Sequence, residues 1–173
     1  MADLANDAGT LRLRLALVDR EAPVRGPVAA EAGDGQAPSG RILASAGVEV
    51  LDPRDAEWWP VLRLAVLYLA PGAVHALVAG LQDVLQGNAP GFAWQEGAEA
   101  ALGVQVGNLE GAPGDHLLVE VGLDLSQHLA ELSQGPRRPG AELALFRWTA
   151  TRAGVVAFAG TLRREAGALI DDE

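Results

Sequence analysis

The stretch Val61–Gly87 constrains the fold most, because it reads as a buried strand followed at once by an amphipathic helix. The nearly continuous apolar run from Val61 to Leu69 is typical of a strand covered on much of both faces. Pro71 suits the first helical turn, where its missing N–H is no loss, and Gly87 suits the end, because glycine tolerates a positive φ. Between them, apolar residues at helical spacing form one stripe: Val74, Leu77, Val78, Leu81, Val84 and Leu85.

Most of the remaining chain is predicted to be extended. Apolar residues alternate with polar or small ones in Leu11–Val18, Arg41–Leu51, Gly91–Gln95, Ala98–Leu109, His116–Leu125 and Glu142–Thr149. The turn signal Gly111–Asp115 has hairpin length, which favours antiparallel pairing. We therefore expect an α+β fold, with an antiparallel sheet of about six or seven strands and two amphipathic helices.

A second helix is predicted at the C-terminal end, with Thr151 as its N-cap. Its apolar stripe is Val155, Phe158, Ala159, Leu162, Ala166 and Leu169, and its first five members fall 81 residues after Val74, Leu77, Val78, Leu81 and Leu85. Each helix follows an apolar strand that other strands precede. This repetition suggests a duplicated βββα unit.

The length of 173 residues favours a single domain over residues 1–173. Residues 21–40 interrupt the pattern, because they hold three prolines and four glycines and almost no large apolar side chains. We interpret them as a mobile loop or insertion that a protease can cut, and that can be deleted without unfolding the core.

The charge balance excludes some partners. The chain has 23 acidic residues against 13 arginines, with no lysine and a net charge of −10. Such a chain lacks the basic footprint that nucleic acids and anionic membranes require, but it suits a basic protein partner. The acidic, polar N-terminus differs from a secretory signal, and no apolar run approaches the ~20 residues of a membrane span. A cytoplasmic location is therefore predicted.

No catalytic or metal motif stands out, so an enzyme is not predicted. The absence of cysteine excludes disulfides and thiolate sites. The three histidines, His75, His116 and His128, form no metal-binding motif, and no serine lies in a nucleophile elbow. The glycines of residues 33–40 lack the Walker lysine. We expect no cofactor.

The best candidate for a binding surface is the stretch from Asp52 to Trp59. Its carboxylates, on Asp52, Asp55 and Glu57, lack the spacing of a calcium loop but could steer a basic partner. Trp58 and Trp59 are adjacent and should point to opposite faces of a strand. An exposed tryptophan beside acids is a plausible anchor for a protein partner. The alternative left open is that one tryptophan belongs to the core and the other covers an edge.

Two segments carry a family resemblance. LYLAPGAVHALVAGLQDVLQG and the final WTATRAGVVAFAGTLRRE, in their order among the strands, resemble the WapI-type immunity proteins of bacterial contact-dependent toxin systems. The resemblance implies a small cytoplasmic protein that neutralises a toxin domain by stoichiometric occlusion, and it supplies no individual functional residues. The insertion and the alanine-rich helices depart from the pattern. The alternative function is an intracellular adaptor or regulatory protein-interaction module, either monomeric or oligomeric.

Overall fold

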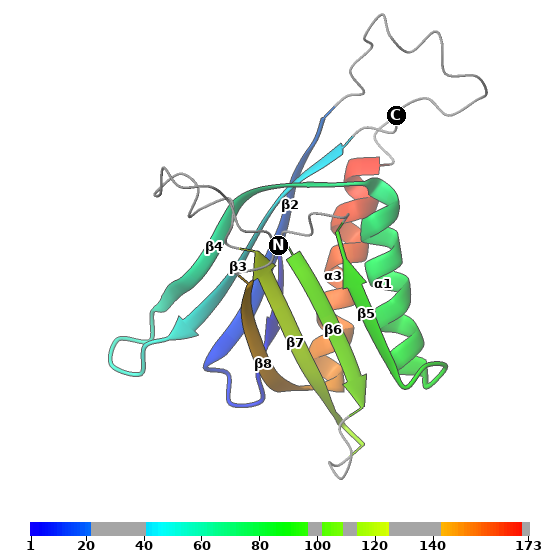
Figure 1. Cartoon of the computed structure of the whole chain (residues 1–173). Helices are drawn as coiled ribbons and strands as arrows, with labels where there is room; N and C mark the ends of the chain where they lie inside the picture. The colour runs from blue at the N-terminus through cyan, green and yellow to red at the C-terminus, as the bar shows by residue number, and fades with distance from the viewer. Residues whose placement is uncertain (22–40, 97–101, 109–113, 125–142, 171–173) are drawn as a thin grey trace, which may run out of the picture.

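In the residues that the structure describes, the computed structural model contains two four-stranded antiparallel sheets and two helices (Figure 1). The structure describes residues 1–21, 41–96, 102–108, 114–124 and 143–170. Sheet A contains, in spatial order, β1 (Ala2–Ala5), β2 (Leu11–Glu21), β3 (Arg41–Leu51) and β4 (Trp58–Leu69). Sheet B contains β5 (Gly91–Gln95), β6 (Leu102–Asn108), β7 (His116–Asp124) and β8 (Leu143–Thr151). The helices are α1 (Pro71–Gln86) and α3 (Arg152–Ile170).

The α+β class and the antiparallel pairing are confirmed, but the strands form two sheets rather than one. The strand that sequence reasoning missed is β1, which pairs with β2 in the register Ala2↔Leu15 to Ala5↔Arg12. At four residues it is too short to show a clear alternation. It changes the predicted βββα unit into ββββα, which occurs in both halves of the chain.

The predicted loop of residues 21–40 begins one residue later in the structure. Glu21 still belongs to β2 and pairs with Arg41 at the start of β3, because the β2–β3 ladder continues up to the connection. The other predicted loop residues, 22–40, lie outside the described part of the chain. So does the stretch SQHLAEL, residues 126–132, whose sequence favours a short helical turn.

Helix α1 begins and ends as its sequence predicts. Gly87 has a φ of 78°, and its N–H donates to the last carbonyls of the helix. Ala70 provides no side-chain cap. Instead, the Glu96 carboxylate, just after β5, accepts the Ala70 N–H at 3.2 Å. A residue from the next structural unit thus satisfies the backbone N–H of the residue that precedes the helix.

Each helix packs on the sheet of the other half. Helix α1, which follows sheet A, contacts β5 and β6 of sheet B, whereas α3, which follows sheet B, contacts β1 and β2 of sheet A. The helices also pack against each other, side by side in Figure 1. Their first residues, Pro71 and Arg152, are 81 positions apart, which matches the repeat seen in the sequence. The buried residues of both sheets and both helices form one continuous core.

Candidate functional site

The turn between β3 and β4 carries the predicted acidic residues and is closed by its own hydrogen bonds. Within it, the Asp52 N–H donates to the Glu57 carbonyl at 2.8 Å. The Asp52 side chain accepts the Arg54 N–H at 2.8 Å, and the Asp55 side chain accepts the Glu57 N–H at 3.0 Å. Two of the three carboxylates therefore also hold the turn in shape. Within the described residues, the Glu57 carboxylate makes no such bond, so its charge faces solvent.

Trp58 and Trp59 lie on opposite faces of sheet A, and neither belongs to the core. Trp59 pairs with Val50 and is 53% exposed. Trp58 pairs with Leu51 and is half-buried beneath the Arg12 guanidinium, 3.9 Å from the ring centroid. The tryptophans that do belong to the core are Trp94 and Trp148. The alternative of one core tryptophan in this pair is thus wrong, because the pair lies where β3 and β4 extend beyond the buried rows.

The arginines of β2 face outward, as their alternation with leucine predicts, and they are paired rather than simply solvated. Glu49 of β3 accepts hydrogen bonds from Arg12 and Arg14, and Asp3 of β1 does the same. The Asp3 carboxylate raises the pKa of Arg14 through a hydrogen bond and through its charge, and the charge of Glu49 raises it further. Burial acts in the opposite direction. These two arginines and two carboxylates therefore form a network of ion pairs across three strands on the outer face of sheet A.

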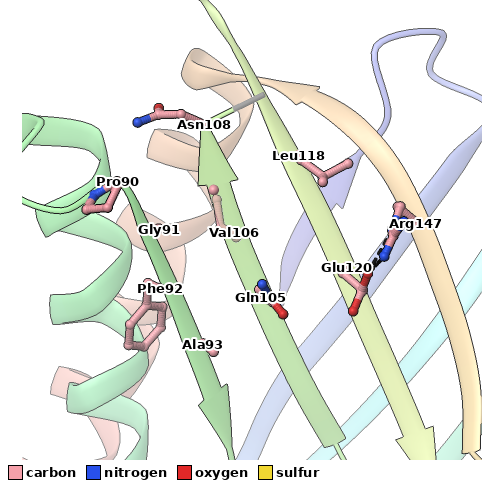
Figure 2. Close-up of a pocket in the computed structure, with 11 residues that line it drawn as sticks. Pro90, Gly91, Phe92, Ala93, Gln105, Val106, Asn108, Leu118, Glu120 and Arg147 are labelled. Atoms are coloured by element: carbon pink, nitrogen blue, oxygen red, sulfur yellow. Dashed lines mark hydrogen bonds and ion pairs between the residues drawn. The ribbon is translucent and has the colours of Figure 1, made fainter. Parts of the chain in front are cut away.

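A second candidate lies on the outer face of sheet B, where a hollow of about 610 Å³ opens (Figure 2). The ladder register places Ala93, Gln105, Glu120 and Arg147 in one row across all four strands. Arg147 donates to Glu120 through two nitrogens, so the row carries no net charge. The alternation of apolar residues in His116–Leu125 places Glu120 on the outward face of its strand, but only the strand register identifies Arg147 as its partner.

Glycines form the floor on both sides of this row. Gly91 pairs with Gly107 on one side, and Gly103 pairs with Gly122 on the other, so the backbone is accessible in both troughs. The second trough, of about 150 Å³, is bordered by Gln95 and Leu145. Phe92 also borders the larger hollow, but its ring lies against α1 (Figure 2). The hollow is thus polar along its central row, and the one aromatic residue among those that line it, Phe92, turns its ring toward α1.

Other chemistry expected of an active centre is not assembled in the described residues. His116 bonds to Asp7 at 2.8 Å, and this pair joins the β1–β2 turn to sheet B. Within the described ranges, no three histidine or acidic side chains gather as metal ligands would. None of the described helices has both the length and the apolar character that crossing a membrane requires.

Comparisons with known proteins identify no family. No family model matches the chain, and no curated protein matches it. A solved structure of the plant transcriptional regulator PBF-2 is similar with a TM-score of 0.43 and 10% sequence identity, over 94% of this chain and 79% of that chain. A likeness at this level carries no functional argument.

Proposed function

We propose that this chain is a cytoplasmic binding protein of the immunity or inhibitor type, which neutralises a toxin domain by stoichiometric occlusion. The observation that carries the proposal is Trp59, a large aromatic side chain left 53% exposed next to an acidic turn. Exposed aromatic anchors with charged surroundings are typical of protein-binding surfaces. The resemblance to WapI-type immunity proteins supplies the class of partner, and the net charge of −10 favours a basic toxin surface.

The contact surface is the end of the β3–β4 hairpin, where the five predicted site residues lie: Asp52, Asp55, Glu57, Trp58 and Trp59. Figure 1 places this turn on the side of the molecule away from α1 and α3. A partner can therefore approach it without meeting either helix. Occlusion at such a tip requires only that the chain binds its partner.

The test begins with the genes beside the one that encodes this chain. The probe is the C-terminal domain of a polymorphic toxin encoded there, expressed alone and together with the chain. We expect the chain to restore growth and to form a one-to-one complex in size-exclusion chromatography with light scattering. A neighbourhood without a toxin gene, or a toxin that the chain neither binds nor neutralises, would contradict the immunity proposal and favour the adaptor alternative.

Binding kinetics then test the acidic surface. Raising the salt concentration from ~0.05 to ~0.5 M should slow association much more than it speeds release, because salt screens steering between exposed charges. Glu57→Arg should act in the same way, and it is the cleanest charge reversal because Asp52 and Asp55 also hold the turn. Asp83→Arg on the exposed surface of α1 is the matched control. Equal effects of the two reversals would exclude the hairpin as the steering surface.

A further inference from the structure

The apolar inner face of sheet A ends in an uncovered row. Leu11, Val50 and Trp59 lie side by side in the ladder register on β2, β3 and β4. The next row inward, Leu13, Val48 and Leu62, is buried or packed against the core. In the terminal row, exposure rises toward the edge: Leu11 is partly buried, Val50 is 40% exposed and Trp59 is 53% exposed. At the β3–β4 turn, the apolar face of sheet A that forms the core therefore extends into a row that solvent reaches.

The opposite face at the same end is already occupied. Arg12 lies over the Trp58 ring at 3.9 Å and donates to one Glu49 carboxylate oxygen from Nε at 2.8 Å and from Nη2 at 2.7 Å. Asp3 accepts a further bond from Arg12 at 3.3 Å. These four residues come from the four strands of the sheet. A guanidinium held by two carboxylates and stacked on an indole fixes the ring in place.

We infer that the two adjacent tryptophans have different roles: Trp59 and Val50 receive an apolar side chain flanked by basic residues of a protein partner, while Trp58 is a positioning residue. The identity of that partner rests on the proposed function, but the surface does not. Two features define the occupant. The row is apolar, and the adjoining turn presents the carboxylates of Asp52, Asp55 and Glu57. An apolar residue with arginine or lysine on both sides matches both features, whereas an acidic segment would be repelled.

The stacking of Arg12 on Trp58 can hold the row of Leu11, Val50 and Trp59 in place before a partner binds. The hairpin projects beyond the part of the sheet that the core supports, so its two strands need another fixed point. Arg12 supplies that point from β2, through Glu49 on β3 and Trp58 on β4. A rigid anchor loses less conformational freedom when a partner binds, which favours affinity.

Short peptides test the surface without any toxin. The probe is a peptide with one phenylalanine between pairs of arginines, titrated into the full chain labelled with ¹⁵N. The four indole N–H signals are assigned by single Trp→Phe variants. We expect weak binding, with a Kd of about 1–10 mM, that shifts the Trp59 indole and the Val50 amide and leaves the Trp58 indole unmoved. The shifts should shrink at high salt.

Two control peptides should not bind at this surface. One replaces the arginines by glutamates, and the other replaces the phenylalanine by serine, and neither should shift the Trp59 signal. Trp59→Ala should abolish the Val50 shift, whereas Tyr68→Ala, which removes another exposed aromatic of β4, should not. Equal shifts with the glutamate peptide, a response centred on Trp58, or no response to the arginine peptide would overturn the proposed surface.

Acrylamide quenching tests the positioning role in a Trp59→Phe background. Arg12→Ala should increase the quenching of Trp58 severalfold, and Arg12→Lys should restore only part of the protection, because a lysine ammonium does not stack as a plane. The Trp59 signal in an Arg12→Ala chain should broaden while the protein stays folded by circular dichroism. Unchanged quenching would remove Trp58 and Arg12 from the proposal. If the chain rescued growth but did not bind the arginine peptide, the inhibitor function would stand and only this surface would be rejected. Failure of the surface can therefore be told apart from failure of the proposed function.

Discussion

The ring of Phe92 on β5 lies directly over the Cα of Gly80 in α1. A Cβ at position 80 would come within 2.0 to 2.3 Å of three ring atoms, which is far closer than any real contact. Gly80 is buried although it lies in the middle of a helix, where glycine costs roughly 1 kcal/mol relative to alanine. The close approach of a strand from the other half of the chain explains this choice of residue.

Gly80→Ala should therefore destabilise the protein, even though alanine favours a helix. Overpacking a tight contact costs ~1–3 kcal/mol, which exceeds the gain in helix propensity. Urea denaturation gives the change in the free energy of unfolding. Gly160→Ala in α3 is the matched control, because its Cβ would meet only the flexible end of Arg164 at 3.8 Å. We expect that variant to be unchanged or slightly more stable. A stabilised Gly80→Ala variant would show that Phe92 can move away at little cost.

Arg152, the first residue of α3, should be one of the most sensitive polar positions. Its guanidinium donates to the Gly114 carbonyl at 2.6 Å, the Leu85 carbonyl at 3.2 Å and the Asn108 side chain at 3.1 Å. It thus satisfies a carbonyl at the C-terminal end of α1 and joins that end to sheet B. Arg152→Ala should lower the free energy of unfolding by ~2–3 kcal/mol, because partly buried carbonyls lose hydrogen bonds from a charged group.

Arg152→Lys provides the second half of this test. A lysine keeps the positive charge near the negative end of the α1 dipole but cannot donate in several directions at once. We expect it to recover less than half of the stability that Arg152→Ala loses in urea denaturation. Full recovery would show that charge alone, rather than the branched geometry, accounts for the contribution.

The alternation of residues could predict much of the fold, because local patterns report local structure. Arg41–Leu51 was predicted as a strand with the bounds that β3 has, and Pro71 and Gly87 were assigned correctly to the two ends of α1. The division into two sheets was not predicted. It depends on which strands pair, and each strand in the described part of the chain pairs with its neighbours in sequence within one half. No local pattern signals that the ladder stops between β4 and β5.

The candidate surface was predictable only in part, for a related reason. The sequence indicated that Trp58 and Trp59 face opposite ways, but not which one is exposed. Which tryptophan is exposed depends on Arg12. This residue is far from Trp58 in the sequence, but strand pairing in sheet A places its guanidinium over the Trp58 ring. Val50 was recognisable as part of the apolar face of its strand, whereas its exposure depends on where the core ends.

Glu96 should make the protein less stable as pH rises. Burial raises the pKa of this carboxyl above its ordinary value of 4.5, and the hydrogen bond from the Ala70 N–H opposes the shift only in part. The folded state therefore holds the proton more tightly than the unfolded state does. Stability falls as pH increases from the unfolded pKa to the folded pKa, and it is constant outside that window.

Glu96→Gln isolates this effect, because the amide oxygen can still accept the Ala70 N–H. The variant should match the natural chain below about pH 4 and exceed it in stability at neutral pH, since it carries no buried charge. Thermal unfolding measured from acid to neutral pH gives both curves. A variant that is less stable than the natural chain at pH 7 would show that the carboxylate strengthens the start of α1 more than its burial costs.

Asp7 should give the opposite dependence on pH. A hydrogen bond with the Thr149 side chain, aided by the hydrogen bond and charge of His116, lowers the pKa of the Asp7 carboxyl below its ordinary value of 3.8. A lowered pKa means that the folded state favours the charged form. The stabilisation is complete above the unfolded pKa and is lost as pH falls through the window below 3.8. Asp7 also connects the two sheets, because its backbone N–H donates to the Thr149 carbonyl at 2.9 Å.

Asp7→Asn keeps that backbone bond and removes the charge. We expect the variant to be slightly less stable than the natural chain at pH 6, and the difference to vanish as both are acidified. Because Asp7 is largely exposed, solvent screening keeps this difference in the free energy of unfolding at about 0.5 kcal/mol or less. Asp55→Asn is the matched control, because it removes an exposed carboxylate that also accepts a backbone N–H but belongs to the hairpin turn of one sheet. If the difference between Asp7→Asn and the natural chain grew on acidification, the sign of the Asp7 effect would be wrong. A difference of the same size at every pH would instead show that the aspartate acts through its shape and not through its charge.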